Sequence, residues 1–483
     1  MRRLWVTGIA LLASAAPLQA EDFGALVELQ LAARSAALFG IDGPLAASAA
    51  PVTGRTFRRP DQPAAAQALA ARSLTVDYLT RDAADRSDQM VLYPPEAPTH
   101  LVGCVESARS EIGRNADGSP LFNPSVQRIA LADGKVETVL RGLNACDMVR
   151  ATAWGTLLVG EERDDGGAYE ILDPLAATDI AVLDRETGAT SAPEAVAKRT
   201  ALPTIAWEGA AVLPSGVVMA GDESRPGEIG VDRDGGTIFK FVPSAPHPGG
   251  RIAALARSPL VDGRTYALQV SCYPDRIEFG QGCEVGNAGW IGVDPATARL
   301  DADGLGATGY YRPEDMDIDP RFEGPGVRFC WVNTGRPASG QLGEIMCAVD
   351  RSPMLAAEDA AAFTVLVERF VIGDEDFNAF DNLAFQPATG ILYVSEDRPN
   401  GDVFACLPDG ADRDAMSDGC IKVLSLADAS AEPTGLVFAP DGLTLYLAVQ
   451  HSDDSEMPER AGFATDDVLK VTGLRLPGGE AGQ

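Results

Sequence analysis

One hairpin phrase returns along this chain, and it constrains the fold more than any other feature of the sequence. Each copy has a short apolar run, a turn containing proline and glycine, and a second apolar run. A turn this short joins antiparallel neighbours, so each copy predicts a β-hairpin. The copies read EGAAVLPSGVVMAGDE at 208–223, EDMDIDPRFEGPGVRFCWVN at 314–333, DNLAFQPATGILYVSED at 381–397 and TGLVFAPDGLTLYLAVQHSD at 434–453, with a degenerate copy, MVRATAWGTLLVGEE, at 148–162.

The spacing of these copies predicts an all-β fold, a β-propeller of about six blades. Comparable positions recur roughly every 60 residues, and one interval of about twice that length indicates a further unit between 235 and 300. Short apolar runs separated by Gly, Pro, Asp and Asn continue from residue 89 onward, as several strands per unit require. A solenoid would show a shorter and more regular period, so propeller blades fit better.

The N-terminal stretch differs in composition from the rest. MRRLWVTGIALLASAAPLQA has arginines, an apolar middle and small residues, which is the layout of a signal peptide, and the Arg2-Arg3 pair leaves a twin-arginine route open. We expect a periplasmic or secreted protein. The predicted order is a signal peptide at 1–20, an Ala-rich leader with short helices at 21–88, the propeller catalytic domain at 89–475 and a tail at 476–483.

Export gives meaning to the eight cysteines, because an even number in an oxidising compartment indicates disulfides. The sequence alone leaves 105 pairings open. Pairs that would each close one short hairpin or loop are the attractive ones, namely Cys272 with Cys283, Cys330 with Cys347 and Cys406 with Cys420, leaving Cys104 for Cys146.

The net charge of −31 argues against binding to nucleic acid or to an anionic membrane surface. It serves solubility, and a second interpretation is that part of the acid excess binds hard cations, which prefer oxygen ligands. With only three histidines, a histidine-rich zinc site is poorly supported. We expect a monomer.

Acidic residues flank the hairpin strands, and a propeller gives them a common location. The innermost strand of each blade lines the central channel, so equivalent strand ends face one another across the axis. Any one of these residues could simply open a turn or end a strand. As a converging set, they need a cation or strongly shifted pKa values. The candidates are Glu162, Glu208, Asp222, Glu314, Asp381, Asp397 and Glu432, with Asn382 beside Asp381 as a further ligand.

Several of these stretches resemble the PhoX-type alkaline phosphatase family of secreted bacterial propellers. The matching phrases are ATAWGTLLVGEE, RTALPTIAWEGA, VMAGDES, TIFKFV, RPED, FDNLAF and EPTGLVFAPDGLTLYLAVQH, in family order from about 140 to 455. The resemblance implies a six-bladed propeller that holds calcium and ferric ions at its axial mouth. It also implies a small phosphate ester as substrate, usually a monoester and sometimes a diester.

Carried over by position, the resemblance implies metal-ligand roles for Glu162, Glu208, Asp222, Glu314, Asp381 and Asp397. It places Arg312, in RPE, on the phosphate, and Arg312 with Glu314 forms the candidate catalytic pair. The chemistry agrees, because hard cations take carboxylate oxygens and arginine offers a planar fork to phosphate.

The departures from the family lie on the side of the iron. The family has a cysteine thiolate ligand before the WGT phrase, whereas here Cys146 is one residue further from Trp154, and Asp147 and Met148 follow it. Trp207 replaces a histidine, and Ala153 replaces a proline. Cys146 is therefore a possible iron ligand or a disulfide partner, and calcium is the firmer expectation.

The leading hypothesis is an exported phosphohydrolase that uses calcium, with iron possible. One alternative is a calcium-dependent lactonase or esterase, which would also suit Asp381 and Asn382 but needs no guanidinium. The other is a non-catalytic binding propeller stabilised by calcium, because a fold does not by itself transfer a function.

Overall fold

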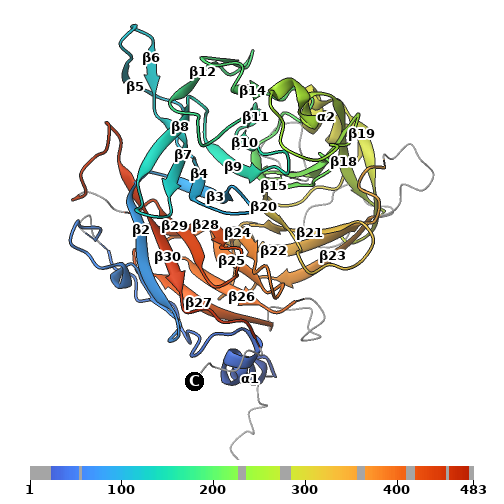
Figure 1. Ribbon diagram of the computed structural model, residues 1–483. Coiled ribbons are helices and arrows are strands. Elements are labelled where there is room, and N and C mark those ends of the chain that lie inside the picture. Colours follow the sequence, from blue (N-terminus) through green and yellow to red (C-terminus); the bar gives the residue numbers. More distant parts are fainter. Residues whose placement is uncertain are drawn as a thin grey trace, which may run out of the picture.

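The computed structural model describes residues 23–53, 57–226, 235–271, 284–355, 365–408, 419–452 and 456–477. The predicted signal peptide, Cys272 and Cys283, and most of the predicted tail lie outside them. Six antiparallel groups of four strands surround a common centre, where strands β3, β9, β15, β20, β24 and β28 lie innermost (Figure 1). This arrangement confirms the predicted β-propeller.

The first three blades follow the chain in order. Blade one holds β3 (Ser87–Tyr93), β4 (His100–Val105), β7 (Pro124–Ala130) and β8 (Val136–Arg141), extended by β12 (Ile180–Asp184) and β13 (Ala189–Thr190), while β5 (Glu111–Arg114) and β6 (Pro120–Phe122) form a separate hairpin. Blade two holds β9 (Cys146–Ala151), β10 (Leu157–Glu161), β11 (Ala168–Ile171) and β14 (Val196–Lys198). Blade three holds β15 (Trp207–Val212), β16 (Val218–Asp222), β17 (Ile238–Pro243) and β18 (Gly263–Val270).

The remaining blades complete the ring. Blade four holds β20 (Pro313–Ile318), β21 (Val327–Asn333), β22 (Glu344–Asp350) and β23 (Val365–Ile372), and β19 (Gly286–Val293) joins it to blade three in one nine-stranded sheet. Blade five holds β24 (Phe380–Phe385), β25 (Leu392–Glu396), β26 (Asp402–Cys406), β27 (Cys420–Leu426) and β1 (Ala68–Ala70). Blade six holds β28 (Glu432–Phe438), β29 (Leu445–Gln450), β30 (Thr465–Thr472) and β2 (Thr75–Ala84).

The repeated hairpin phrase forms the two inner strands of its blade, and its glycine has a physical reason. Gly216, Gly390 and Gly442 close the turns with φ of +94°, +73° and +69°, a backbone conformation that costs glycine nothing. The apolar runs on either side are buried between blades. One hydrophobic cluster, for example, joins Met90 and Leu92 of blade one to Tyr446 and Ala448 of blade six.

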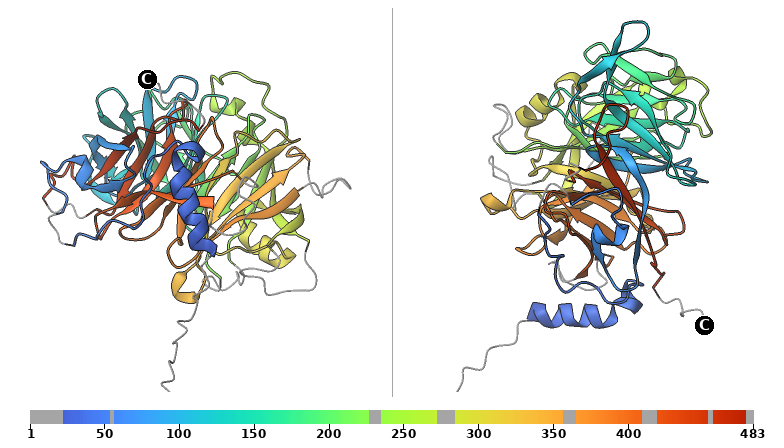
Figure 2. Two further views of the ribbon diagram at one scale, coloured as in Figure 1. Left: turned by 90° about the horizontal axis from the view of Figure 1, so that it is seen from below. Right: turned by 90° about the vertical axis from the view of Figure 1, so that its left-hand side faces the viewer.

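The stretch predicted as a leader contributes more than short helices. It contains α1 (Phe23–Leu38), which lies outside the sheets at the periphery (Figure 2). The other α-helix among the described residues, α2 (Ala298–Leu305), is far from this stretch in sequence and follows β19. However, β1 pairs with β27, and β2 pairs with β30 from Thr75 opposite Thr472 to Ala84 opposite Thr465. The circle of six blades is thus closed by an N-terminal strand, β2. Its half-exposed TVDYLTRDAA lacks the continuous apolar run that marks the inner strands, so its sequence does not distinguish it from the predicted leader.

A buried cluster holds this N-terminal strand in place. The Asp467 carboxylate of β30 accepts hydrogen bonds from Arg58 Nη2 at 2.7 Å and from Arg81 Nε at 2.9 Å. Both Arg58 and Asp467 are fully buried.

Among the described helices, α1 has 16 residues and α2 has 8, and neither has the length and apolar character needed to cross a membrane.

Candidate metal centre

Each blade presents two side chains at the axis, one from each of its two inner strands. The first is an acidic residue at the beginning of the innermost strand, and the second is the residue that directly follows the next strand. We call these twelve positions the axial ring. From blade one to blade six they are Asp88 and Glu106, Asp147 and Glu162, Glu208 and Glu223, Glu314 and Thr334, Asp381 and Asp397, and Glu432 and His451.

A β-bulge accompanies the first position in five of the six blades. The pairing register of the inner hairpin shifts between Ser87 and Met90 in blade one, and it skips Asp147 in blade two. It shifts at the corresponding place in blades three, four and five. In blade six the shift follows Thr434, and Glu432 stays paired with Gln450. A bulge frees a residue from the ladder and re-aims its side chain. Regular pleating would send alternate residues to the two faces of a blade, so the bulges turn these acids toward the axis.

The ring brings carboxylate oxygens within reach of shared cations. Three groups each offer oxygens that lie within 4.8 Å of one another: Asp88, Glu106 and Asp147; Asp147, Glu162 and Glu208; and Glu208, Glu314 and Asp381. Because Asp147 and Glu208 each belong to two groups, the three groups form a continuous chain. Buried Oδ1 atoms of Asp88 and Asp147 have no hydrogen-bond partner, as expected of atoms whose partner is a cation.

Arg312 is the cation that the chain itself supplies to the ring. Its guanidinium contacts three carboxylates: Nε lies 2.5 Å from Glu223, Nη2 2.7 Å from Glu314 and Nη1 2.9 Å from Asp397. The three carboxylates hold the guanidinium in place, and the Arg312 side chain is still 14% exposed, so it is accessible. In blade six, His451 Nε2 lies 3.2 Å from Glu432.

Three further acids each directly precede a ring acid in the sequence, and they form ion pairs with arginines rather than facing the axis. Glu161 binds Arg185, Asp222 binds Arg299, and Glu396 binds Arg398. Arg299 comes from helix α2, and Arg185 follows β12 of blade one. The predicted ligand Asp222 belongs to this set, and its neighbour Glu223 takes the ring position. A one-residue shift along a strand changes the face to which a side chain points, so Glu223 and not the predicted Asp222 points toward Arg312 and the ring.

The other predicted residues are close to where the sequence placed them. Glu162, Glu208, Glu314 and Asp381 lie in the groups described above, and Asp397 and Glu432 complete the ring on the side of Arg312 and His451. Asn382 lies beneath them. Its amide nitrogen donates to Asp381 Oδ1 at 3.2 Å, and its amide oxygen accepts the Gly435 N–H.

Burial and mutual repulsion dominate the electrostatics of the ring. Burial raises the pKa of Glu314 to about 8, although the nearby Arg312 guanidinium acts in the opposite direction, and it raises the pKa of Glu432 to about 7. Burial and neighbouring carboxylates also hold the pKa values of Asp88, Asp147, Glu162, Glu208 and Asp381 well above the ordinary range. Burial opposes ionisation of Asp397 as well, but Arg312 overcomes it and lowers the pKa of that carboxyl. Bound cations would favour the ionised form of every one of these groups.

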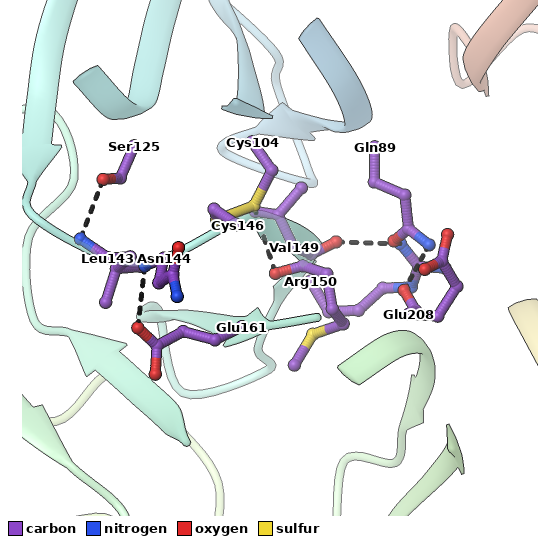
Figure 3. Close-up of a disulfide and its surroundings, with 11 residues drawn as sticks. Gln89, Cys104, Ser125, Leu143, Asn144, Cys146, Val149, Arg150, Glu161 and Glu208 are labelled. Atoms are coloured by element: carbon purple, nitrogen blue, oxygen red, sulfur yellow. Dashed lines mark hydrogen bonds between the residues drawn. A yellow bond between two sulfur atoms is a disulfide. The ribbon is translucent and has the colours of Figure 1, made fainter. Parts of the chain in front are cut away.

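The cysteine next to the ring is in a disulfide. Cys146 is bonded to Cys104 of β4, and the pair is buried beside Val149 and Arg150 (Figure 3). Cys330 is bonded to Cys347, and Cys406 to Cys420, as the sequence predicted. No thiolate is available to a metal at the ring from the described residues, so the iron-thiolate ligation implied by the family resemblance does not fit these residues.

A polar layer supports the ring from beneath. Arg150 donates to Gln89 Oε1 at 2.8 Å and also bonds Asp315, and Gln89 donates to Asp315 at 3.0 Å and to the carbonyl oxygen of Glu208 (Figure 3 draws the Gln89, Arg150 and Glu208 side chains). These bonds connect the innermost strands of blades one to four. They limit the freedom of the strands that carry the carboxylates.

Comparison with known proteins gives the family. The family described as alkaline phosphatase PhoX matches residues 132–453, about two thirds of the chain. The chain belongs to the PhoX family. The match begins before Asp147 and ends just after His451, so it includes all of the axial ring except Asp88 and Glu106. Membership in the PhoX family supports a phosphatase hydrolase built on this propeller.

A solved structure with a TM-score above 0.5 shows the same fold at low identity. Pseudomonas fluorescens PhoX in complex with vanadate, a transition state analogue, is 15% identical, covers 90% of this chain and 98% of its own, and has a TM-score of 0.60. A Xanthomonas campestris gluconolactonase is 13% identical, covers 89% and 96%, and has a TM-score of 0.41. A search of curated proteins found no match.

Four ring acids, Thr334 and His451 were not among the predicted site residues. Asp88 lies one residue before the predicted start of the propeller, in SDQMVLY, which has no proline-glycine turn of the repeat type. Glu106 and Asp147 lack the second acid that marks EE, DE and ED, and Glu223 was displaced by its neighbour. One signal could have found them: an acid at the start of the first strand and another polar residue just after the second, in every unit.

Proposed function

We propose that this protein is an exported phosphohydrolase that cleaves phosphate esters at the axial ring, with calcium held by the ring carboxylates and Arg312 on the phosphate. The observation that carries the proposal is the placement of Arg312, an accessible guanidinium among three ring carboxylates. An ester without charge would need no such group. A phosphate needs the planar fork of an arginine, which binds two of its oxygens at once.

The charge balance of the ring explains why cations are required. Ten of the twelve ring positions are carboxylic acids, and the other two are Thr334 and His451. The arginines that lie within 4.0 Å of ring acids among the described residues are Arg312, Arg86 and Arg225. With those acids ionised, a phosphate dianion would be repelled from the site. Hard cations remove that repulsion, and oxygen ligands at this density suit calcium. Ferric ion is a further candidate for an all-oxygen site, but ligation by Cys146 is not part of this proposal.

The protein residues have separable roles in this proposal. Glu162, Glu208, Glu314 and Asp381 would hold cations in the groups that the structure brings together, and Asp397 and Glu432 would adjoin them. When bound, the cations would polarise the phosphoryl group and position or activate the nucleophile. Glu223 and Asp397 fix the plane of the Arg312 fork, so that it meets the phosphoryl oxygens without reorganising. His451, paired with Glu432, is placed to exchange a proton at the rim of the site.

The test is hydrolysis of an aryl phosphate by full-length protein purified from an oxidising compartment. Calcium removal with a chelator should abolish turnover, and restoring calcium should recover it. Arg312→Ala should lower kcat/KM about 10³-fold, the lower end of the range measured for arginines that stabilise phosphoryl transfer. The matched control is Arg398→Ala, which breaks the neighbouring pair with Glu396 but leaves the ring intact.

Three outcomes would reject the proposal or part of it. If Arg312→Ala remains active with an unchanged melting temperature, Arg312 has no role at the phosphate. If the wild-type protein hydrolyses lactones but no phosphate ester, the site belongs to an esterase. If calcium raises the melting temperature and no ester of either kind is cleaved, the ring is a structural metal site.

A further inference from the structure

The second blade differs from what the family resemblance implies at one position, and Asp147 is the residue concerned. In the family, a cysteine thiolate precedes the WGT phrase, and Cys146 stands one residue too far from Trp154 to match it. Counted back from Trp154, the matching position is Asp147. The Cys146 sulfur is bonded to Cys104, whereas the Asp147 side chain, 3% exposed, is one of the ring acids.

The geometry around Asp147 is that of a shared ligand. Its carboxylate lies within 4.8 Å of ligand oxygens of Asp88 and Glu106 in one group and of Glu162 and Glu208 in a second group. Its buried Oδ1 has no hydrogen-bond partner, and the same is true of Oδ1 of the facing Asp88, which is 4% exposed. Leaving such atoms unpaired in a protein interior is costly, and a bound cation would remove that cost.

We propose that Asp147 replaces the family's thiolate and bridges two hard cations, one held with Asp88 and Glu106 and the other with Glu162 and Glu208. This inference rests on the proposed function only in assigning cations to the ring. A carboxylate has two oxygens and can serve two cations at once, whereas a thiolate would favour a softer metal. The substitution therefore makes the centre an all-oxygen site, and its disulfide keeps the neighbouring sulfur out of the ring.

The test measures bound metal rather than turnover. Full-length protein is stripped with a chelator, dialysed against calcium and analysed for calcium per chain, and its melting temperature is recorded with and without calcium. Asp88→Asn and Glu162→Gln should each lose one calcium. Asp147→Asn should lose both, and the stabilisation that calcium gives should fall more than in either single-site variant. The matched control is Asp222→Asn, a buried acid held by Arg299 outside the three groups, which should keep both ions.

A second comparison concerns the sulfur. The double variant Cys104→Ser with Cys146→Ser should keep both calcium ions, and the wild-type protein should show no free thiol at Cys146. Unchanged calcium content in Asp147→Asn, or loss of metal in the double serine variant, would overturn the inference. Because no substrate is used, its failure is distinct from that of the proposed function. A protein that binds both ions but cleaves nothing rejects only the phosphohydrolase.

Discussion

The stability of the cation-free protein should fall as the pH rises from 5 to 8, and this follows from the buried acids of the ring. Burial raises the pKa of Glu314 from 4.5 to about 8 and that of Glu432 from 4.5 to about 7. The folded state therefore holds protons that the unfolded state has already released. Stability is full below about pH 4.5, is lost as the pH rises, and reaches its floor near pH 8. Asp397 has a lowered pKa, so its opposite contribution changes only in the acid range below this window.

The magnitude can be worked from Glu314. A pKa that rises from 4.5 to about 8 corresponds to about 5 kcal/mol, at 1.36 kcal/mol per unit of pKa. Glu432 and the other ring acids with raised pKa values act in the same direction, so about 5 kcal/mol is the share of the loss that Glu314 alone accounts for. At an unfolding entropy near 2.1 cal/mol/K per residue, a chain of this length should lose about 5 °C in melting temperature.

The assay is thermal unfolding from pH 5 to pH 8 in two buffers, one with a chelator and one with calcium in excess. The melting temperature should fall with pH in the chelator. With calcium present the trend should disappear, because cations bind the ionised carboxylates and stabilise the folded state. Glu314→Gln removes one of these acids and should make the curve in chelator less steep, while the other ring acids with raised pKa values keep its direction. A melting temperature that rises with pH in the chelator would refute the reasoning that these acids are protonated when the ring holds no cation.

Two further predictions concern the stability of the propeller, one at the strand that closes the circle of blades and one at a disulfide within blade four. Asp467→Asn removes the shared partner of Arg58 and Arg81 and leaves a buried arginine without its carboxylate, so denaturant unfolding should show a loss of about 3 to 5 kcal/mol. Replacing Cys330 and Cys347 together by serine opens a link with a sequence separation of 17, which should cost about 3 kcal/mol in the same measurement.

The sequence predicted the inner hairpins well because their signal is local. A proline-glycine turn between two apolar runs specifies a hairpin, and the structure places β24 with β25 and β28 with β29 as the repeat implied. The closing strand β2 depends on a partner almost 400 residues away, and nothing near it in sequence reveals that pairing. Its half-exposed pattern is compatible with several environments, so only the three-dimensional structure assigns it to blade six.

The sequence predicted only those members of the axial ring that belong to a local repeat signal. Glu208, Glu314 and Asp381 stand at the starts of recognisable repeats, so the sequence placed them together. Asp222 was preferred to Glu223 because an alternating pattern cannot tell which of two adjacent acids faces the axis. That choice depends on the end of β16 and on Arg299, which comes from a distant helix and takes Asp222 for itself.

The backbone before the ring supports the assignment of Asp147 independently of its side chain. In four blades the residue two positions before the first ring acid has a left-handed backbone conformation. These residues are Arg86 with φ of +66°, Ala145 with +53°, Arg312 with +60° and Ala379 with +52°. Such a conformation costs a residue with a side chain about 1 kcal/mol or more. Strain repeated at one place in several blades indicates a function that requires it. Ala145 precedes Asp147 in the same way as Arg312 precedes Glu314. Blade two therefore presents Asp147 to the axis by the same backbone device, and Cys146, one residue earlier, is turned away from it.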